Sequence, residues 1–170
     1  MRIVLIGPPA AGKTRIGKRL ARDLGVKFTD TDVLIVAENG AIPQIFAEHG
    51  EAYFRALERQ QVMKALEGDG IIAFGGGAVM NPATQADLET VSDTRVVLLD
   101  VHADVVRQRL SNGKRPLVTS IESWQALVDS RRATYERLAH FMIDTSRRPT
   151  REVAGEIADW ARTRPPEERK

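Results

Sequence analysis

The chain has 170 residues, of which 42% are hydrophobic and 28% charged, and its formal net charge at pH 7 is +2. This length fits one ordinary domain with a packed core. The absence of cysteine excludes disulfides, zinc–thiolate sites and thiol nucleophiles. The low net charge argues against nucleic-acid binding driven by bulk charge, and the early apolar run Ile3–Ile6 is too short for a membrane span or a signal peptide. We therefore expect a cytoplasmic protein that binds neither nucleic acid nor a membrane.

Short apolar segments alternate along the chain with segments of helical periodicity. Strands are expected at 2–6, 26–29, 70–74, 95–100 and 141–143. Helices are expected before Gly25, between Asp32 and Gly68 with a break at Gly50, and at 82–88, 105–110, 123–138 and 150–162. Because the strands are apolar throughout and alternate with helices, the pattern predicts an α/β fold with a parallel sheet. One domain would cover residues 1–163, followed by a flexible tail at 164–170.

Positive charge is concentrated in the second half of the chain. The segment 107–151 contains ten Lys or Arg residues and four Asp or Glu residues, and Arg outnumbers Lys by 19 to 6 over the whole chain. Guanidinium groups present planar forks of donors that suit phosphate and carboxylate groups. The cluster is compatible with a solvated helix face or with a site for small anions.

A phosphate-binding motif follows the first predicted strand. Residues 7–14, Gly-Pro-Pro-Ala-Ala-Gly-Lys-Thr, match the pattern G-x-x-x-x-G-K-[ST], and a predicted helix comes directly after them. The backbone N–H groups of such a loop surround phosphate, Lys13 reaches the β- and γ-phosphates, and the Thr14 hydroxyl can bind Mg²⁺. A chance match in a turn is the alternative, but the flanking strand and helix favour the functional interpretation. The short chain and the lack of an Asn-Lys-x-Asp motif favour a small-molecule kinase over a GTP-dependent switch or a large ATPase.

Two carboxylates follow the second predicted strand. In a doubly wound sheet, Asp30-Thr-Asp32 would lie beside the phosphate loop, because the carboxyl ends of parallel strands share one edge. One carboxylate could then bind the hydration shell of Mg²⁺ while the other faces an acceptor hydroxyl. A turn or a helix cap explains the same pattern without any function.

Two further motifs point to an acceptor site. Arg55 and Glu58 are three residues apart on a predicted helix, so Glu58 could hold the guanidinium in place for a carboxylate ligand. A surface ion pair is the alternative for that spacing. The run Gly75-Gly76-Gly77 ends a buried strand, and its backbone entropy cost suggests a close approach of N–H groups to a ligand rather than a simple turn.

In this combination the sequence resembles the shikimate kinase family. The resemblance runs from the phosphate loop through Asp30-Thr-Asp32, Phe54-Arg55-x-x-Glu58, Gly75-Gly-Gly-Ala-Val79, Arg115-Pro-Leu117 and Arg131-x-x-x-Tyr135 to Asp144-Thr-x-Arg-Arg148. It implies phosphorylation of the 3-hydroxyl of shikimate by ATP, in the pathway to chorismate and aromatic amino acids. It also implies Mg²⁺ as the cofactor, shikimate and ATP as the partners, and a monomer.

The resemblance further implies a P-loop kinase fold like that of nucleoside monophosphate kinases. It places five parallel strands between helices, an acceptor-binding region at about 31–62 and a mobile lid at about 110–122. By position, the implied catalytic residues are Lys13, Asp32 and Arg115, and the implied Mg²⁺ ligands are Thr14 and Asp30. The implied shikimate ligands are Asp32, Arg55, Glu58, Gly75, Gly76, Gly77 and Arg131. The implied ATP ligands are Ala10, Ala11, Gly12, Lys13, Thr14, Arg15, Arg109, Arg115 and Arg148.

The chain departs from the family pattern at a few positions. Arg15 replaces a small hydroxyl residue in the phosphate loop, and the segments 110–114 and 147–149 are contracted, which concerns the adenine-side assignments of Arg109 and Arg148. Two other functions remain open. One is a kinase for a different small acceptor, such as gluconate or a nucleotide, and the other is a nucleotide-binding regulator without catalysis.

Overall fold

A five-stranded parallel sheet forms the centre of the molecule. The structure is a computed structural model, and it describes residues 1–109 and 120–163. The strands are β1 (Arg2–Ile6), β2 (Phe28–Asp30), β3 (Gly70–Ala73), β4 (Thr94–Asp100) and β5 (Phe141–Asp144), in the order β2-β3-β1-β4-β5. β1 is central, and its five residues are all buried. The predicted α/β class and parallel sheet are confirmed.

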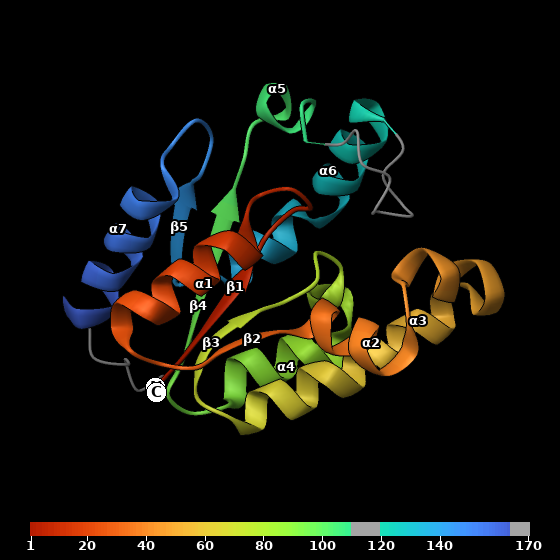
Figure 1. Ribbon diagram of the computed structural model, residues 1–170, viewed down its shortest axis with the longest axis horizontal. Coiled ribbons are helices and arrows are strands. Elements are labelled where there is room, and N and C mark those ends of the chain that lie inside the picture. Colours follow the sequence, from red (N-terminus) through yellow and green to blue (C-terminus); the bar gives the residue numbers. More distant parts are fainter. Residues whose placement is uncertain (110–119, 164–170) are drawn as a thin grey trace.

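Helices cover both faces of this sheet (Figure 1). They are α1 (Lys13–Leu24), α2 (Thr31–Asn39), α3 (Ile42–Glu67), α4 (Pro82–Thr90), α5 (Ala103–Val106), α6 (Ile121–Leu138) and α7 (Thr150–Thr163), with a short 3₁₀ turn, η1, at Ala78–Met80. Side chains alternate along a strand. Ile3 and Leu5 therefore pack in one core cluster with α1 and α7, while Val4 and Ile6 pack in a second cluster with α3 and α4.

Helix α6 contributes to both core clusters. Trp124, near its beginning, packs in the cluster that contains α1 and α7, and Tyr135, near its end, packs in the opposite cluster. A third, smaller cluster of Ile35, Ile45 and Phe54 joins α2 to α3. These two helices lie within the predicted acceptor-binding region.

Several predicted boundaries differ from the structure, most of them by one or two residues. The second strand begins at Phe28 rather than at residue 26, because the N–H of Val26 donates back to the Ala21 carbonyl and closes the end of α1. The helix expected at 105–110 is the shorter and earlier α5. The expected break at Gly50 is confirmed, since its φ of 81° interrupts α3.

Candidate functional site

The phosphate loop connects β1 to α1 at the carboxyl edge of the sheet. Gly7 has a φ of 139°, and a Cβ there would lie 2.2 Å from the carbonyl oxygen of Leu99, so only glycine fits. Gly12 adopts the left-handed conformation and caps α1. The Lys13 ammonium donates to the carbonyls of Gly7 and Pro8 at 2.8 and 2.9 Å. The loop is thus folded around its own lysine at the beginning of a helix, where backbone N–H groups favour an anion.

The loop meets the second strand through a single hydrogen bond. The Thr14 hydroxyl donates to Oδ2 of Asp30 at 2.5 Å. The other oxygen of Asp30 accepts from the N–H groups of Asp32 and Val33 at 3.0 and 3.2 Å, and so caps α2. The helix cap considered as an alternative is therefore present, and Asp30 also places a carboxylate oxygen against Thr14.

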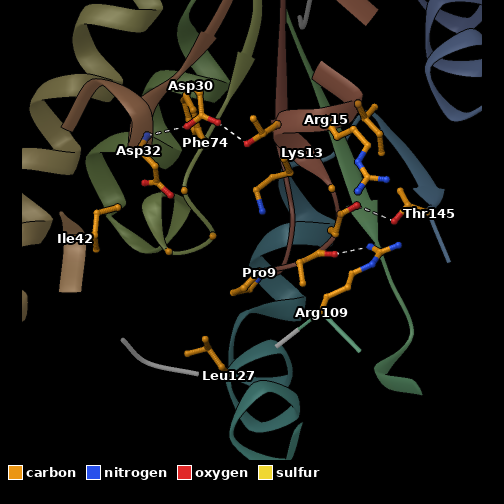
Figure 2. A pocket seen from close by; sticks show the side chains of 18 of the residues that line it. Pro9, Lys13, Arg15, Asp30, Asp32, Ile42, Phe74, Arg109, Leu127 and Thr145 are labelled. Atoms are coloured by element: carbon orange, nitrogen blue, oxygen red, sulfur yellow. Dashed lines mark hydrogen bonds between the residues drawn. The ribbon is translucent and has the colours of Figure 1, made fainter. Parts of the chain in front are cut away.

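Asp32 is half-buried, and its carboxyl group points into the cavity beside this loop (Figure 2). Its Oδ1 is buried and has no hydrogen-bond partner among the described residues. Burial, together with the nearby charges of Glu58 and Asp30, raises the pKa of Asp32 to about 6. A carboxyl group with a pKa near the working pH of a cell has the properties of a general base.

Arg55 and Glu58 form a partly buried ion pair rather than a surface pair. Their atoms approach to 2.8 Å, and the side chain of Glu58 is only 5% exposed. Burial raises the pKa of Glu58, although Arg55 opposes this shift. Arg55 also approaches Glu51 at 3.3 Å, so its guanidinium is held by one glutamate a turn before it and one a turn after it on the same face of α3. This geometry fixes a fork of donors at the wall of the cavity.

The three glycines pass between these charged groups. A Cβ on Gly75 would lie 2.7 Å from Oδ1 of Asp32 and 2.8 Å from Oε2 of Glu58, and a Cβ on Gly77 would lie 2.4 Å from the Arg55 guanidinium. Real Cβ atoms do not approach other atoms this closely, so a side chain at either position would push the ends of these charged groups aside. The glycine run thus leaves room for them, and the close approach of its N–H groups to a ligand stays a prediction.

Helix α6 supplies the second guanidinium of the acceptor side. Arg131 is 6% exposed, and its Nη1 lies 3.4 Å from the ideal Cβ position of Gly76. One turn later, the Tyr135 hydroxyl donates to the Gly76 carbonyl at 2.6 Å. Arg132, which could be confused with Arg131 in the sequence, instead pairs with Asp100 at 3.2 Å.

One cavity of about 500 Å³ brings the predicted residues together. Every predicted site residue except Arg115 lines it, and Arg115 lies outside the described residues. Lys13, Asp32 and Arg109 are among those visible in Figure 2. Arg55 and Arg131 line both this cavity and a second cavity of about 390 Å³. Among the described residues, no cluster of three or more His, Cys, Asp or Glu side chains forms a metal site.

The two arginines predicted for the adenine side already have protein partners. Arg109 donates to the Ala10 carbonyl at 2.8 Å, and Arg148 pairs with Glu156 at 2.7 Å. Both line the cavity. Arg15 lines it as well, from the first turn of α1.

Two threonines in the site escaped the sequence analysis. The Thr31 hydroxyl accepts from the Gly75 N–H at 3.2 Å, and the Thr145 hydroxyl donates to the Ala11 carbonyl at 2.8 Å. Both side chains are buried. Each follows an aspartate at the end of a strand, in Asp30-Thr31 and Asp144-Thr145, and this repeated pair is the signal that could have identified them.

The fold and the cavity together define a P-loop kinase similar to the nucleoside monophosphate kinases. Residues 9–162 match the family model for shikimate kinase. The chain belongs to the shikimate kinase family.

The relatives agree with this assignment over nearly the whole chain. A shikimate kinase of Corynebacterium efficiens is 38% identical over 160 residues, which cover 91% of this chain and 93% of the relative. A shikimate kinase of Mycobacterium avium is 42% identical over 151 residues, which cover 85% of this chain and 84% of the relative. The structure of the Acinetobacter baumannii shikimate kinase in complex with shikimate superposes with a TM-score of 0.88 at 31% identity, covering 94% of this chain and 91% of that one. A gluconokinase from Sinorhizobium meliloti, at 16% identity and a TM-score of 0.62, shares the fold alone.

Proposed function

We propose that this protein transfers the γ-phosphoryl group of ATP to the 3-hydroxyl of shikimate, giving shikimate 3-phosphate and ADP. The single observation that carries the assignment is one cavity with an anion-binding loop on one side, two arginines on the other and the half-buried carboxyl group of Asp32 between them. The loop suits a triphosphate, and the paired guanidinium forks suit the carboxylate of the acceptor. Family membership supports the same reaction.

In this proposal the protein positions the two substrates and stabilises charge, because phosphoryl transfer needs little covalent chemistry from the enzyme. Arg55 and Arg131 bind the acceptor carboxylate, with the backbone of Gly76 between them. Asp32 then accepts or orients the proton of the attacking hydroxyl. Lys13 stabilises the negative charge of the transferring group, and Arg115, which lies outside the described residues, joins it when the lid closes.

Mg²⁺ is the proposed metal, and the chemistry of the side chains around the loop fits it. The Thr14 hydroxyl and the Asp30 carboxylate provide adjacent oxygen atoms, the ligand type that Mg²⁺ prefers. Thr14 would bind the ion directly and Asp30 through water. When bound, the ion would neutralise charge on the β- and γ-phosphates.

The other partner assignments remain proposals. We propose a cytoplasmic monomer with one kinase domain at residues 1–163, whose partners are ATP and shikimate and neither nucleic acid nor a membrane. No helix among the described residues is long and apolar enough to cross a membrane. The proposed lid at 110–122 lies mostly outside the described residues, and the tail at 164–170 lies wholly outside them.

An ADP-release assay tests the reaction directly. With ATP, Mg²⁺ and shikimate, we expect ADP formation that depends on shikimate, and little ADP from gluconate or nucleoside monophosphates. Turnover with another acceptor but not with shikimate would favour a different small-molecule kinase. Nucleotide binding without turnover of any acceptor would favour the regulator.

Arg55→Lys is expected to weaken shikimate binding by at least about tenfold. The substitution keeps one positive charge but replaces a planar fork, held by Glu58 at 2.8 Å, with a point charge. Isothermal calorimetry with shikimate measures the change. The matched control is Arg59→Lys, one turn later on α3, whose guanidinium contacts Asp87 at 2.6 Å. Equal shikimate affinities for the two variants would contradict the proposed carboxylate clamp.

A further inference from the structure

The carbonyl groups of the phosphate loop are held in place by hydrogen bonds from side chains. Each of the five consecutive carbonyls from Gly7 to Ala11 accepts a hydrogen bond from a side chain. The donors are Lys13 Nζ to Gly7 and Pro8 at 2.8 and 2.9 Å, Trp124 Nε1 to Pro9 at 2.8 Å, Arg109 Nη1 to Ala10 at 2.8 Å, and Thr145 Oγ1 to Ala11 at 2.8 Å. In a trans peptide unit the N–H points away from the preceding C=O. Bonds that fix the carbonyls therefore also fix the direction of the N–H groups that bind phosphate.

Trp124 is the donor that connects this loop to a distant helix. Its side chain is 1% exposed, and it lies 115 residues away from Pro9 in the sequence. A buried indole N–H needs an acceptor, so a satisfied core tryptophan is one explanation. The acceptor here, however, belongs to the phosphate loop, and Trp124 lies in the first turn of α6, which a capping box of Ser120 and Ser123 fixes.

The conformation of the loop requires such support. Ala10, the residue after Pro9, has a φ of 70°, in the left-handed region that is unfavourable for a residue with a side chain. A strained residue persists only where its surroundings hold it. The Pro9 carbonyl, just before the strained residue, accepts a hydrogen bond from Trp124. The carbonyl of Ala10 itself accepts one from Arg109.

The same helix also reaches the acceptor side of the cavity. Two turns after Trp124, Arg131 lines the cavity, and Tyr135 donates to the Gly76 carbonyl at 2.6 Å. Helix α6 is thus bonded to the phosphate loop at one end and to the glycine run at the other.

We propose that Trp124 is a positioning residue for nucleotide binding. Its indole N–H holds the Pro9 carbonyl and keeps the phosphate loop in its anion-binding shape, in register with α6. The proposal rests on the nucleotide-binding role of the loop and does not depend on the identity of the acceptor.

Trp124→Phe tests the role of the N–H, because phenylalanine fills most of the same space without a donor. The Pro9 carbonyl then loses its partner and no longer fixes the loop. We expect the Kd for Mg²⁺–ADP and the KM for ATP to rise at least about fivefold. Shikimate affinity without nucleotide should stay within about twofold. The control is Trp160→Phe in α7, which removes the stack of the Trp160 indole on Phe141 of β5 and should leave both affinities unchanged.

The outcomes separate a positioning role from a structural one. An unchanged Kd for Mg²⁺–ADP in Trp124→Phe overturns the proposal. So does an equal loss of ADP and shikimate affinity with a lowered Tm, because a general loss of packing would produce it. Failure of the wild-type protein to phosphorylate shikimate would refute the proposed reaction, but it would leave the ADP measurements interpretable.

A second measurement remains decisive if Trp124→Phe does not fold. The chain has two tryptophans, so Trp160→Phe leaves Trp124 as the only indole. We expect its fluorescence emission to shift on titration with Mg²⁺–ADP, with a midpoint equal to the calorimetric Kd. An emission spectrum that saturating Mg²⁺–ADP does not change would refute the coupling of Trp124 to the loop.

Discussion

Replacing Asp32 with asparagine is expected to reduce kcat about 10²- to 10⁴-fold, the usual contribution of a general base. Asparagine has nearly the same shape, so the cavity and its arginines should remain in place, but the amide cannot accept the proton of the acceptor hydroxyl. Steady-state kinetics with shikimate as the varied substrate measure the change. A variant with kcat within about threefold of wild type would remove Asp32 from the proposed mechanism.

The same substitution is expected to stabilise the folded protein at neutral pH, which controls for misfolding. The pKa of Asp32 is raised from 3.8 to about 6, so the folded state holds this proton more tightly than the unfolded chain does. As pH rises between these two values, the free energy of unfolding falls, and above pH 6 the buried charge costs about 3 kcal/mol. Asparagine removes this cost, so Tm at pH 7.5 should rise. A Tm that falls would instead attribute the lost activity to damaged packing.

The pH dependence of turnover should report the titration of Asp32. A base works only when it is deprotonated, so kcat/KM for shikimate should fall about tenfold per pH unit below a pH of about 6. The terminal phosphate of ATP also titrates near this pH. The residual activity of Asp32→Asn reports that contribution alone, so the ratio of the two profiles isolates Asp32. A ratio that does not change between pH 5 and 8 would contradict the raised pKa.

Gly75→Ala is expected to reduce kcat/KM for shikimate about 100-fold. The new methyl group would lie 2.7 Å from Asp32 Oδ1 and 2.8 Å from Glu58 Oε2, closer than real Cβ contacts. The ends of both side chains must then move, and a displacement of about 1 Å in a site costs on the order of 10²-fold in rate. Because Glu58 holds Arg55 in place, a displaced Glu58 should also weaken the binding of the acceptor carboxylate to Arg55.

Gly155→Ala is the matched control for this substitution. A Cβ on Gly155 meets nothing within 4 Å, and the residue lies within helix α7, where alanine is favoured by about 1 kcal/mol. We expect wild-type kinetics and a slightly higher Tm. If Gly75→Ala also had the kcat/KM of the wild type, the site would not need the open space at Gly75.

Local patterns in the sequence were sufficient for the fold class. The apolar strand 2–6, the motif at 7–14 and the helix that ends before Gly25 have short-range signals, and the structure confirms all three. Strand β2 was misplaced by two residues because the end of α1 continues through the hydrogen bond from Val26 to Ala21, which no propensity of Val26 predicts. The short helix α5 was likewise expected too late in the chain.

The candidate site could be predicted from the sequence only in part, and the rest depended on the tertiary structure. The sequence by itself determined which residues have the chemistry to bind phosphate, carboxylate and Mg²⁺, because motifs such as that at 7–14 require particular residue types at fixed spacings. Only the tertiary structure decided that Asp32 lies beside Glu58 with a buried Oδ1, that Asp30 both caps α2 and contacts Thr14, and that Trp124 holds the phosphate loop. Long-range hydrogen bonds join residues up to 134 positions apart in the sequence, as they join Thr145 and Ala11. Such contacts, like the burial of side chains, arise only when the sheet brings its strand ends together.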